Sequence, residues 1–369
     1  MINPSFSGVA SRRDFMKSIT AVTALLGLPA AMAPKLAQAA QDEDKRPAVI
    51  WLHFQECTGC SESLLRSDHP DIPELLFDII NLEYQETLMP GAGLQAEHAL
   101  HSAIENNRGS YILVVEGAVP LKEGGIYCKI GGVTAKKSLE EAVDGALAVV
   151  CLGTCAAYGG IPAADPNPTG AVSAASLVAN KPLINLPGCP PNTYNLPATI
   201  LYFTTFGKLP EMDEQNRPLF AYGRRIHDHC ERRSHFDAGR FAKAYGDETH
   251  KAGYCLYELG CKGPETFANC SVLRFSDGLV WPISIGHPCV GCTEDKIAFH
   301  KKISDKAQVY HPASPSWYPP SAVEPQGKPV GAITTLVVGA AAGAAIGYAA
   351  GKGKSLPATT EEGEDHEKH

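Results

Sequence analysis

The sequence predicts an α/β protein in three parts: a parallel-sheet domain, a cysteine-rich domain with little regular structure, and one transmembrane helix near the C-terminus. Two observations support this prediction. In the first half of the 369-residue chain, short and continuously apolar runs alternate with helix-like stretches, which is typical of a parallel sheet covered on both faces. From about Phe220 to Trp317 the apolar periodicity fades, and Gly, Cys, Pro, His and charged residues dominate.

An export signal is predicted at residues 1–39. The sequence reads S-R-R-D-F-M-K from residue 11, followed by a weakly apolar stretch at about 19–33 and the small-residue motif A-Q-A at 37–39. This pattern indicates a twin-arginine signal with a cleavage site. Proteins that use this route fold before export, in a cytoplasm that keeps thiols reduced. The signal therefore favours metal ligation over disulfides for the twelve cysteines, and one or two disulfides stay open as an alternative.

The first domain is placed at residues 47–215. Its apolar runs read as strands and the amphipathic stretches between them as helices, so the alternation predicts strand–helix–strand units and a parallel sheet. Strands are predicted at Val49–Leu52, Tyr111–Val115, Ala148–Leu152 and Leu183–Leu186, and helices at Ile72–Leu82, Gln95–Asn106 and Ser138–Gly145.

Four cysteines follow three of the predicted strands. Cys57 and Cys60 come after the first strand, Cys155 after the third and Cys189 after the fourth. Ligands of parallel sheets bind at the carboxyl ends of the strands, so these thiols should converge on one edge. Four thiolates hold either one four-iron cluster or one zinc ion. An iron–sulfur cluster is favoured, because structural zinc sites more often use local knuckles than ligands gathered from across a sheet.

The second domain, at residues 216–318, holds two more groups of candidate ligands. One possible site is formed by His227, Cys230, Cys255 and Cys261, with His229 as an alternative to His227. The other has only three thiolates, from Cys270, Cys289 and Cys292, with Pro282 between them. Three thiolates suit a three-iron cluster, because the fourth corner has no ligand to hold iron. Metal clusters would also stabilise a segment that is poor in apolar repeats.

The C-terminal part contains a second apolar segment at residues 330–350. Its 21 residues carry no charge, and a helix of that length spans about 30 Å, the thickness of a bilayer core. A flexible Gly/Ala linker is the alternative. Lys352 and Lys354 follow directly and would lie on the cytoplasmic side, with residues 351–369 as a solvated tail. The net charge of −8 is mild, and the absence of a basic stripe argues against nucleic-acid binding.

Longer motifs resemble the small subunit of membrane-bound nickel–iron hydrogenases. They read E-C-T-G-C-S-E-S from residue 56, G-T-C-A from 153, P-G-C-P-P-N from 187, G-Y-C-L-Y-E-L-G-C-K-G-P-E-T from 253 and W-P-I-S-I-G-H-P-C-V-G-C from 281. The resemblance runs from the twin-arginine signal to the last cysteine pair, and the C-terminal anchor also fits. It implies a flavodoxin-like first domain.

The resemblance implies three clusters in a line. It assigns a proximal [4Fe–4S] cluster to Cys57, Cys60, Cys155 and Cys189. A medial [3Fe–4S] cluster is assigned to Cys270, Cys289 and Cys292, with Pro282 where a fourth cysteine would stand. A distal [4Fe–4S] cluster is assigned to His227, Cys230, Cys255 and Cys261, which selects His227 over His229. Cys128 and Cys151 are left over and are expected to be small buried apolar residues.

The same resemblance implies that the nickel–iron centre belongs to a large partner subunit. The complex would interconvert H2 with two protons and two electrons, and this chain would carry the electrons on the periplasmic side of the cytoplasmic membrane. Its acceptor would be a cytochrome b, or a quinone-linked subunit with a ferredoxin-like protein, and a dimer of heterodimers is possible. Oxygen-tolerant members carry two extra cysteines where this chain has Gly59 and Gly160, so an oxygen-sensitive enzyme is expected.

Two carboxylates near the proximal motif are candidates for a proton or polarising role. Glu56 directly precedes Cys57, and Glu116 follows another strand end on the same sheet edge. Hydrogen bonding of each carboxylate to loop amides is the alternative.

Three other functions are alternatives to this interpretation. They are an isolated electron carrier, a subunit of a quinone-reducing complex, and an envelope protein stabilised by disulfides or zinc. The quinone-reducing family has a related four-cysteine site but lacks the second cluster-rich half.

Overall fold

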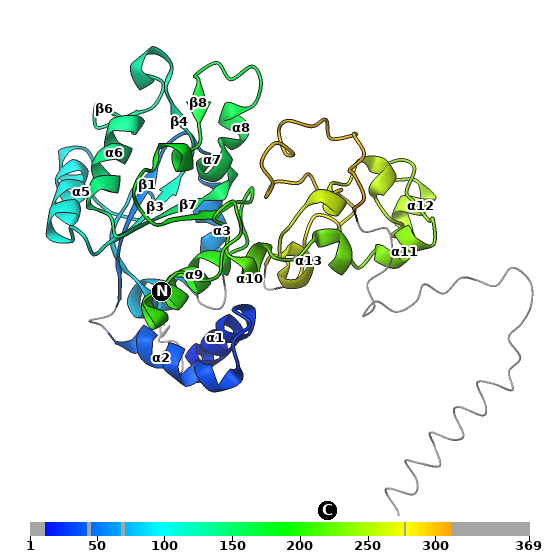
Figure 1. Ribbon diagram of the computed structural model, residues 1–369, viewed down its shortest axis with the longest axis horizontal. Coiled ribbons are helices and arrows are strands. Elements are labelled where there is room, and N and C mark those ends of the chain that lie inside the picture. The colour runs from blue at the N-terminus through cyan, green and yellow to red at the C-terminus, as the bar shows by residue number, and fades with distance from the viewer. Residues whose placement is uncertain (1–11, 43–45, 68–70, 277, 311–369) are drawn as a thin grey trace, which may run out of the picture. The chain divides into compact units, whose positions relative to one another are not determined.

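The computed structural model describes residues 12–42, 46–67, 71–276 and 278–310. Its centre is a five-stranded sheet in the order β2-β1-β3-β7-β9, and every neighbouring pair is parallel. The strands are β1 (Ala48–His53), β2 (Asn81–Gln85), β3 (Ile112–Glu116), β7 (Ala148–Leu152) and β9 (Leu183–Leu186). The predicted α/β class with a parallel sheet is confirmed (Figure 1).

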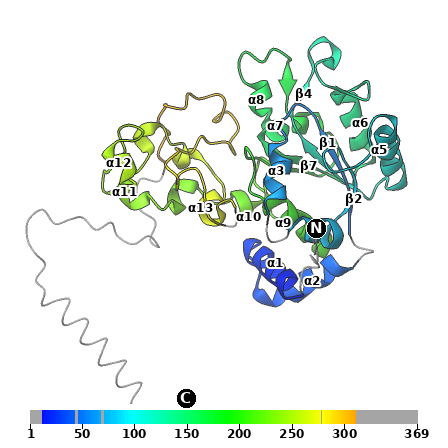
Figure 2. The same ribbon diagram turned by 180° about the vertical axis from the view of Figure 1, so that it is seen from behind.

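Helices cover both faces of this sheet (Figures 1 and 2). Alternate strand residues point to opposite faces, so each face has its own apolar core. On one face Ile50 and Leu113 pack with α5 (Leu94–Asn106), α6 (Ala135–Gly145) and α7 (Gly153–Tyr158). On the other face Val49 and Val114 pack with α3 (Gly59–Leu65) and α9 (Asn195–Phe206). Burial on both faces explains why the strand sequences are continuously apolar.

Short elements complete the sheet domain. Two small antiparallel pairs join β4 (Val119–Pro120) to β8 (Ala171–Val172) and β5 (Lys129–Ile130) to β6 (Val133–Thr134). The remaining helical turns are η4 (Lys122–Gly125), α8 (Gly160–Ala163) and η5 (Ala174–Leu177).

The predicted strands and two of the three predicted helices are confirmed, but the helix predicted at Ile72–Leu82 is wrong at its C-terminal end. The helical stretch consists of α4 (Ile72–Glu74) and the π-helical turn η3 (Leu75–Ile79). Ile80 is extended, with φ −128° and ψ 160°, and the chain then enters β2. This strand lies at the sheet edge and has exposed polar residues, so its sequence lacks the apolar run that marks the central strands.

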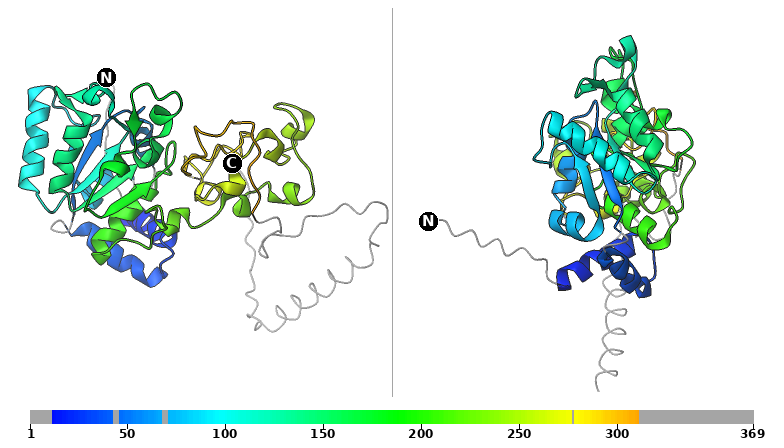
Figure 3. Two further views of the ribbon diagram at one scale, coloured as in Figure 1. Left: turned by 45° about the horizontal axis from the view of Figure 1, so that its top comes forward. Right: turned by 90° about the vertical axis from the view of Figure 1, so that its left-hand side faces the viewer.

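The second half has little regular structure, as predicted. It contains α10 (Leu219–Tyr222), η6 (Ile226–His229), α11 (Arg233–Asp237), α12 (Glu248–Lys251), η7 (Tyr257–Leu259), η8 (Gly263–Glu265) and α13 (Cys270–Leu273), and Figure 3 shows these short turns linked by loops. Its small apolar core includes two candidate ligands, Cys230 and Cys261, beside Ile226, Leu256 and Trp281. A core this small leaves much of the stability to other interactions.

Buried polar contacts hold the loop of Cys292, Thr293 and Glu294 to the segment after α9 and to the sheet domain. Arg217 donates hydrogen bonds from Nη1 to Oε1 of Glu294 and to the carbonyl oxygen of Thr293, both at 2.9 Å. The Thr154 hydroxyl, at the end of β7, donates to the carbonyl oxygen of Cys292. These contacts hold the loop that carries Cys292 against the carboxyl edge of the sheet.

The predicted signal segment packs on the sheet domain. It forms α1 (Arg12–Leu25), η1 (Ala30–Met32) and α2 (Ala33–Gln41), and α2 contacts α9, as Figures 1 and 2 show. Ile19 and Leu36 lie in one apolar cluster with Leu201 of α9. The apolar segment predicted to span a membrane, residues 330–350, lies outside the described residues. Within the described ranges, every helix is too short or too polar to cross a bilayer.

Candidate metal-cluster sites

The four cysteines at the strand ends meet at one edge of the sheet. Cys57 lies in the loop after β1, Cys60 in the first turn of α3, Cys155 in α7 after β7, and Cys189 in the loop after β9. Burial raises the pKa of the Cys60 thiol, and the neighbouring groups Glu116, Cys155, Cys189 and Cys57 raise it further. The four thiols are therefore close enough to act on one another electrostatically.

Three glycines keep the space beside these thiols free of side chains. A Cβ atom on Gly153, where φ is +86°, would lie 2.4 Å from Sγ of Cys60. A Cβ atom on Gly160, where φ is +53°, would lie 2.7 Å from Sγ of Cys155. On Gly59 it would lie 3.1 Å from Sγ of Cys57. The space among the four thiols can therefore hold a compact inorganic group, so these residues fit a four-iron cluster.

The second group of cysteines lines an apolar cavity of about 480 Å³. Cys270, at the start of α13, shares this cavity with Cys289 and Cys292, and apolar side chains such as Trp281 line the rest of it. Pro282 also lines the cavity, and it offers no metal-binding atom. Three convergent thiols in an apolar cavity fit a three-iron cluster.

The third group surrounds a smaller cavity that is lined by His227, Cys230, Cys255 and Cys261. Nε2 of His227 is buried and has no hydrogen-bond partner, which is costly unless a metal occupies that position. Burial lowers the pKa of His227 to about 4, so the imidazole is neutral and able to ligate. His229 is outside this lining, which favours His227 as the ligand.

The thiols of these groups favour their neutral form. Burial raises the pKa of Cys155, Cys255 and Cys270 to about 12 and that of Cys292 to about 11. Metal binding to such thiols must displace protons, so the ligation energy has to exceed this penalty. All twelve cysteines lie in the described ranges, and all are free thiols, so the geometry gives no support to a disulfide framework.

The two remaining cysteines lie away from the three groups. Cys151 is fully buried in the core of β7, and burial raises the pKa of its thiol to about 12. Cys128 is half-buried and packs against the same core.

The three groups form a series. Cys189 of the first group lines the cavity of the second group, and its backbone forms a hydrogen bond with the Cys292 thiol. Burial raises the pKa of Cys289, and the nearby Cys261 of the third group raises it further. The middle group thus borders both of the others.

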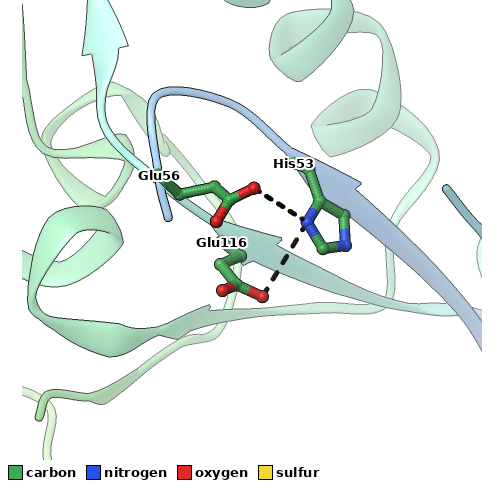
Figure 4. A group of neighbouring side chains, drawn as sticks. All are labelled: His53, Glu56 and Glu116. Carbon is green, nitrogen blue, oxygen red and sulfur yellow. Dashed lines mark hydrogen bonds and ion pairs between the residues drawn. The ribbon is translucent and has the colours of Figure 1, made fainter. Parts of the chain in front are cut away.

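Two carboxylates and a histidine, drawn in Figure 4, form a cluster that contacts the first group through the backbone of Cys60. Nδ1 of His53 is 3.4 Å from Oε1 of Glu56 and 3.9 Å from Oε2 of Glu116. Burial lowers the pKa of His53, but the hydrogen bond with Glu56 and the negative charge of Glu116 outweigh it, so the net shift is upward. Gln85 lies 3.1 Å from the other ring nitrogen.

The two carboxylates have different surroundings. Glu116 accepts hydrogen bonds from the backbone N–H of Cys60 at 3.0 Å and from the hydroxyl of Ser61 at 2.7 Å, so it fixes the first turn of α3. Glu56 accepts a hydrogen bond from the Thr58 hydroxyl at 3.2 Å, and its Oε2 is buried without a partner. The sequence patterns did not mark His53 as a candidate site residue. The signal that could have marked it is its position at the end of β1, close to the first cysteine motif.

Family comparisons agree with both halves of the chain. Residues 222–304 match the model for the C-terminal domain of the NiFe/NiFeSe hydrogenase small subunit, and residues 57–203 match that for the 20 Kd subunit of NADH ubiquinone oxidoreductase. The match to the hydrogenase C-terminal domain makes a quinone-reducing complex the weaker alternative. The model for the NADH ubiquinone oxidoreductase subunit matches only residues 57–203, in the sheet domain.

Individual relatives are similar over most of the chain. The hydrogenase-2 small chain of Escherichia coli strain K12 is 50% identical over 340 residues, covering 91% of each chain. The quinone-reactive Ni/Fe-hydrogenase small chain of Wolinella succinogenes is 53% identical and covers 77% of this chain and 80% of its own. The crystal structure of the reduced Ni-Fe-Se hydrogenase from Desulfomicrobium baculatum matches with a TM-score of 0.64 and 37% identity, covering 68% of this chain and 94% of that one. The chain belongs to the family of NiFe hydrogenase small subunits, the electron-transfer subunits that pair with a large subunit.

Proposed function

We propose that this chain carries electrons from H2 oxidation in the large subunit through a proximal [4Fe–4S], a medial [3Fe–4S] and a distal [4Fe–4S] cluster. The observation that carries the proposal is the series of three ligand groups, in which Cys189 adjoins Cys292 and Cys289 adjoins Cys261. When bound, such clusters supply one-electron carriers. The protein's own residues hold them in order.

The proposed ligands are those expected from the sequence. They are Cys57, Cys60, Cys155 and Cys189 for the proximal cluster, Cys270, Cys289 and Cys292 for the medial cluster, and His227, Cys230, Cys255 and Cys261 for the distal cluster. The neutral His227 replaces one thiolate and so removes one negative charge, which raises the potential relative to an all-thiolate cluster in the same surroundings. Pro282 gives the medial site no fourth ligand, which supports a three-iron cluster there.

We also propose supporting roles for the two carboxylates. Glu116 holds the amide of Cys60 and thereby orients a proximal ligand, in the manner of an outer-shell partner. Glu56 has a free buried oxygen and a hydrogen bond to Thr58, which suits a role in proton movement near the proximal site. An unchanged hydrogen-uptake rate in Glu56→Gln would remove Glu56 from any proton route.

An oxygen-sensitive enzyme is proposed from Gly59 and Gly160. Both positions face proximal thiols, and a Cβ atom at either would contact one. Cysteines there would bring two extra thiolates to the cluster, and this chain lacks them. Hydrogen uptake is expected to stop under sustained air-level oxygen, and continued uptake in air would contradict the proposal.

The chain is proposed to be exported folded and held at the membrane. Residues 1–39 would be the signal, 47–215 and 216–318 the two soluble domains, 330–350 the anchor and 351–369 a cytoplasmic tail. One relative, 48% identical, is named the periplasmic [NiFe] hydrogenase small subunit 1 of Nitratidesulfovibrio vulgaris. The name of the quinone-reactive relative supports a membrane acceptor, either a cytochrome b or a quinone-linked subunit with a ferredoxin-like protein. A chain truncated after residue 329 should leave the membrane fraction.

Purification of the complex tests the main proposal. A tagged chain should copurify with a larger, nickel-containing chain, and the complex should oxidise H2 with an artificial acceptor. Iron and sulfide should be present in the small subunit. Copurification without nickel or hydrogen uptake would favour the stand-alone electron carrier, and zinc without iron would refute the cluster assignment.

A further inference from the structure

The last described stretch of the chain runs along the loop that carries two proposed distal ligands, Cys255 and Cys261. We call residues 301–308 the strap and residues 255–265, from Cys255 to Glu265, the distal loop. Polar contacts join the two at several points: the Tyr257 hydroxyl to the Ala307 carbonyl at 2.9 Å, Lys306 to Glu258 at 2.6 Å, Lys301 to Glu265 at 2.8 Å, and the Gln308 N–H to Glu265 at 2.8 Å.

Lys262 lies at the centre of these contacts and is buried, with 2% of its surface exposed. Its Nζ donates hydrogen bonds to the carbonyl oxygens of Gly260 at 2.8 Å and Ile303 at 3.1 Å, and also to that of Asp305. Among the described residues, no carboxylate forms an ion pair with Lys262. Three carbonyl groups, two of them from the strap, therefore stabilise a buried ammonium ion.

The same residue is attached to both neighbouring cluster sites. Its backbone N–H donates to the carbonyl oxygen of Cys289 at 2.7 Å, and Cys289 is a proposed medial ligand. It directly follows Cys261, a proposed distal ligand. Its charge is close enough to the Cys261 thiol to act on it electrostatically.

The strap and the distal loop approach each other too closely for a side chain at Gly260. A Cβ atom there would lie 2.0 Å from the carbonyl oxygen of Ile303, and φ of Gly260 is +90°. This tight approach brings two strap carbonyls within reach of the Lys262 ammonium. Two neighbouring residues of the distal loop thus make this contact: Gly260 allows the close approach, and Lys262 binds the strap carbonyls.

We propose that Lys262 is a positioning residue of the distal site, whose ammonium ion fastens the strap to the distal loop and keeps a positive charge beside Cys261. The inference rests on the proposed distal ligands and gives a role to a residue that lies in the motif from residue 253 without being one of its ligands. A fixed positive charge stabilises the reduced, more negative cluster, so it raises the reduction potential at the electron exit. A fixed strap also holds Cys261 in place.

Two substitutions test the charge and the fastening in the purified heterodimer. Lys262→Met keeps the length of the side chain and removes the charge and the donors, whereas Lys262→Arg keeps the charge. Lys306→Met is the matched control, because Lys306 is a half-exposed strap residue whose ion pair with Glu258 lies on the surface. Redox-poised electron paramagnetic resonance measures the distal cluster, and limited trypsin cleavage at residues 301–302 measures how firmly the strap is held.

In Lys262→Met the ratio of reduced to oxidised distal cluster at a fixed potential is expected to fall about tenfold, which for one electron corresponds to about 59 mV. The proximal and medial signals should keep their potentials. Strap cleavage should accelerate at least about tenfold, because more than one hydrogen bond is lost. Lys262→Arg should retain most of the distal potential. Lys306→Met should leave the distal potential unchanged and accelerate cleavage by less than about twofold, because a largely exposed ion pair contributes little.

A milder variant covers the case in which Lys262→Met does not assemble. Tyr257→Phe removes one strap hydrogen bond and leaves Lys262 intact, and it should accelerate strap cleavage about fivefold. The proposal is overturned if Lys262→Met leaves both the distal potential and the rate of strap cleavage unchanged. If Lys262→Met fails to assemble, an unchanged cleavage rate in Tyr257→Phe overturns it. A missing distal four-iron signal in the unmodified enzyme is a different result, because it refutes the ligand assignment itself.

Discussion

Arg217 joins the segment after α9 to the loop of Thr293 and Glu294, and its replacement should have a large effect on stability. Its side chain is 6% exposed, and it forms ion pairs with Asp213 at 2.7 Å and Glu294 at 2.9 Å. It also donates to the carbonyl oxygen of Thr293 at 2.9 Å. Burial raises the pKa of Glu294, and the charge of Arg217 opposes that rise. Arg217→Met would leave Glu294 buried without its cation.

Breaking a buried ion pair by removing one partner costs about 3–5 kcal/mol. For a chain of this size, 1 kcal/mol corresponds to a change of about 2 °C in Tm. The Tm of Arg217→Met should therefore fall by roughly 6–10 °C. In the double variant Arg217→Met/Glu294→Gln the fall should be smaller, because only Asp213, which is 20% exposed, is then left without its cation.

Thermal unfolding followed by circular dichroism provides the measurement. All variants are heated at one scan rate, because cluster-containing proteins unfold irreversibly and their Tm then depends on that rate. Arg66→Met is the control, since the ion pair of Arg66 with Glu62 is exposed, and its Tm should change by less than about 2 °C. A fall of that same small size in Arg217→Met would refute the reasoning.

Three further predictions follow from single residues. Gly153→Ala should abolish the proximal cluster signal and spare the other two, because φ is +86° and the new Cβ would lie 2.4 Å from Sγ of Cys60; a normal proximal signal would contradict this. Glu116→Gln should raise the proximal potential in a redox titration, since a buried negative charge beside the amide of Cys60 is lost; an unchanged potential would count against it. The hydrogen bond from the His250 N–H is the main cause that lowers the pKa of Asp247 from 3.8 to about 2, so this helix cap is complete above pH 4 and is lost as the pH falls towards 2. The protection factor of the His250 amide, which corrects for the pH dependence of intrinsic exchange, should fall in that window in the parent and show no such step in Asp247→Ala.

The sequence predicted those features of the fold that depend on local patterns. Continuous apolar runs marked β1, β3, β7 and β9, because central parallel strands are buried on both faces. The edge strand β2 was missed, since Asn81 and Glu83 interrupt its apolar pattern and one side of the strand is unpaired. The convergence of the first cysteine group was predictable because its members follow strands whose ends share one edge of the sheet, whereas the grouping of the other two sets came from the resemblance.

Residues that act through distant backbone atoms could not be predicted. Lys262 binds carbonyl oxygens of Ile303 and Asp305, about 40 positions away, and carbonyl groups leave no mark in a sequence. Thr154 is similar, because its hydroxyl binds the carbonyl oxygen of Cys292. Arg217 resembles any surface arginine until the fold brings Glu294 to it.

Redox-poised electron paramagnetic resonance of the purified heterodimer tests the central claim most directly. The account predicts a three-iron signal in the oxidised enzyme and two four-iron signals in the reduced enzyme. It also predicts that His227→Cys lowers the potential of only one of the four-iron clusters. An oxidised enzyme without a three-iron signal, or a small subunit with zinc and no iron, would contradict the account.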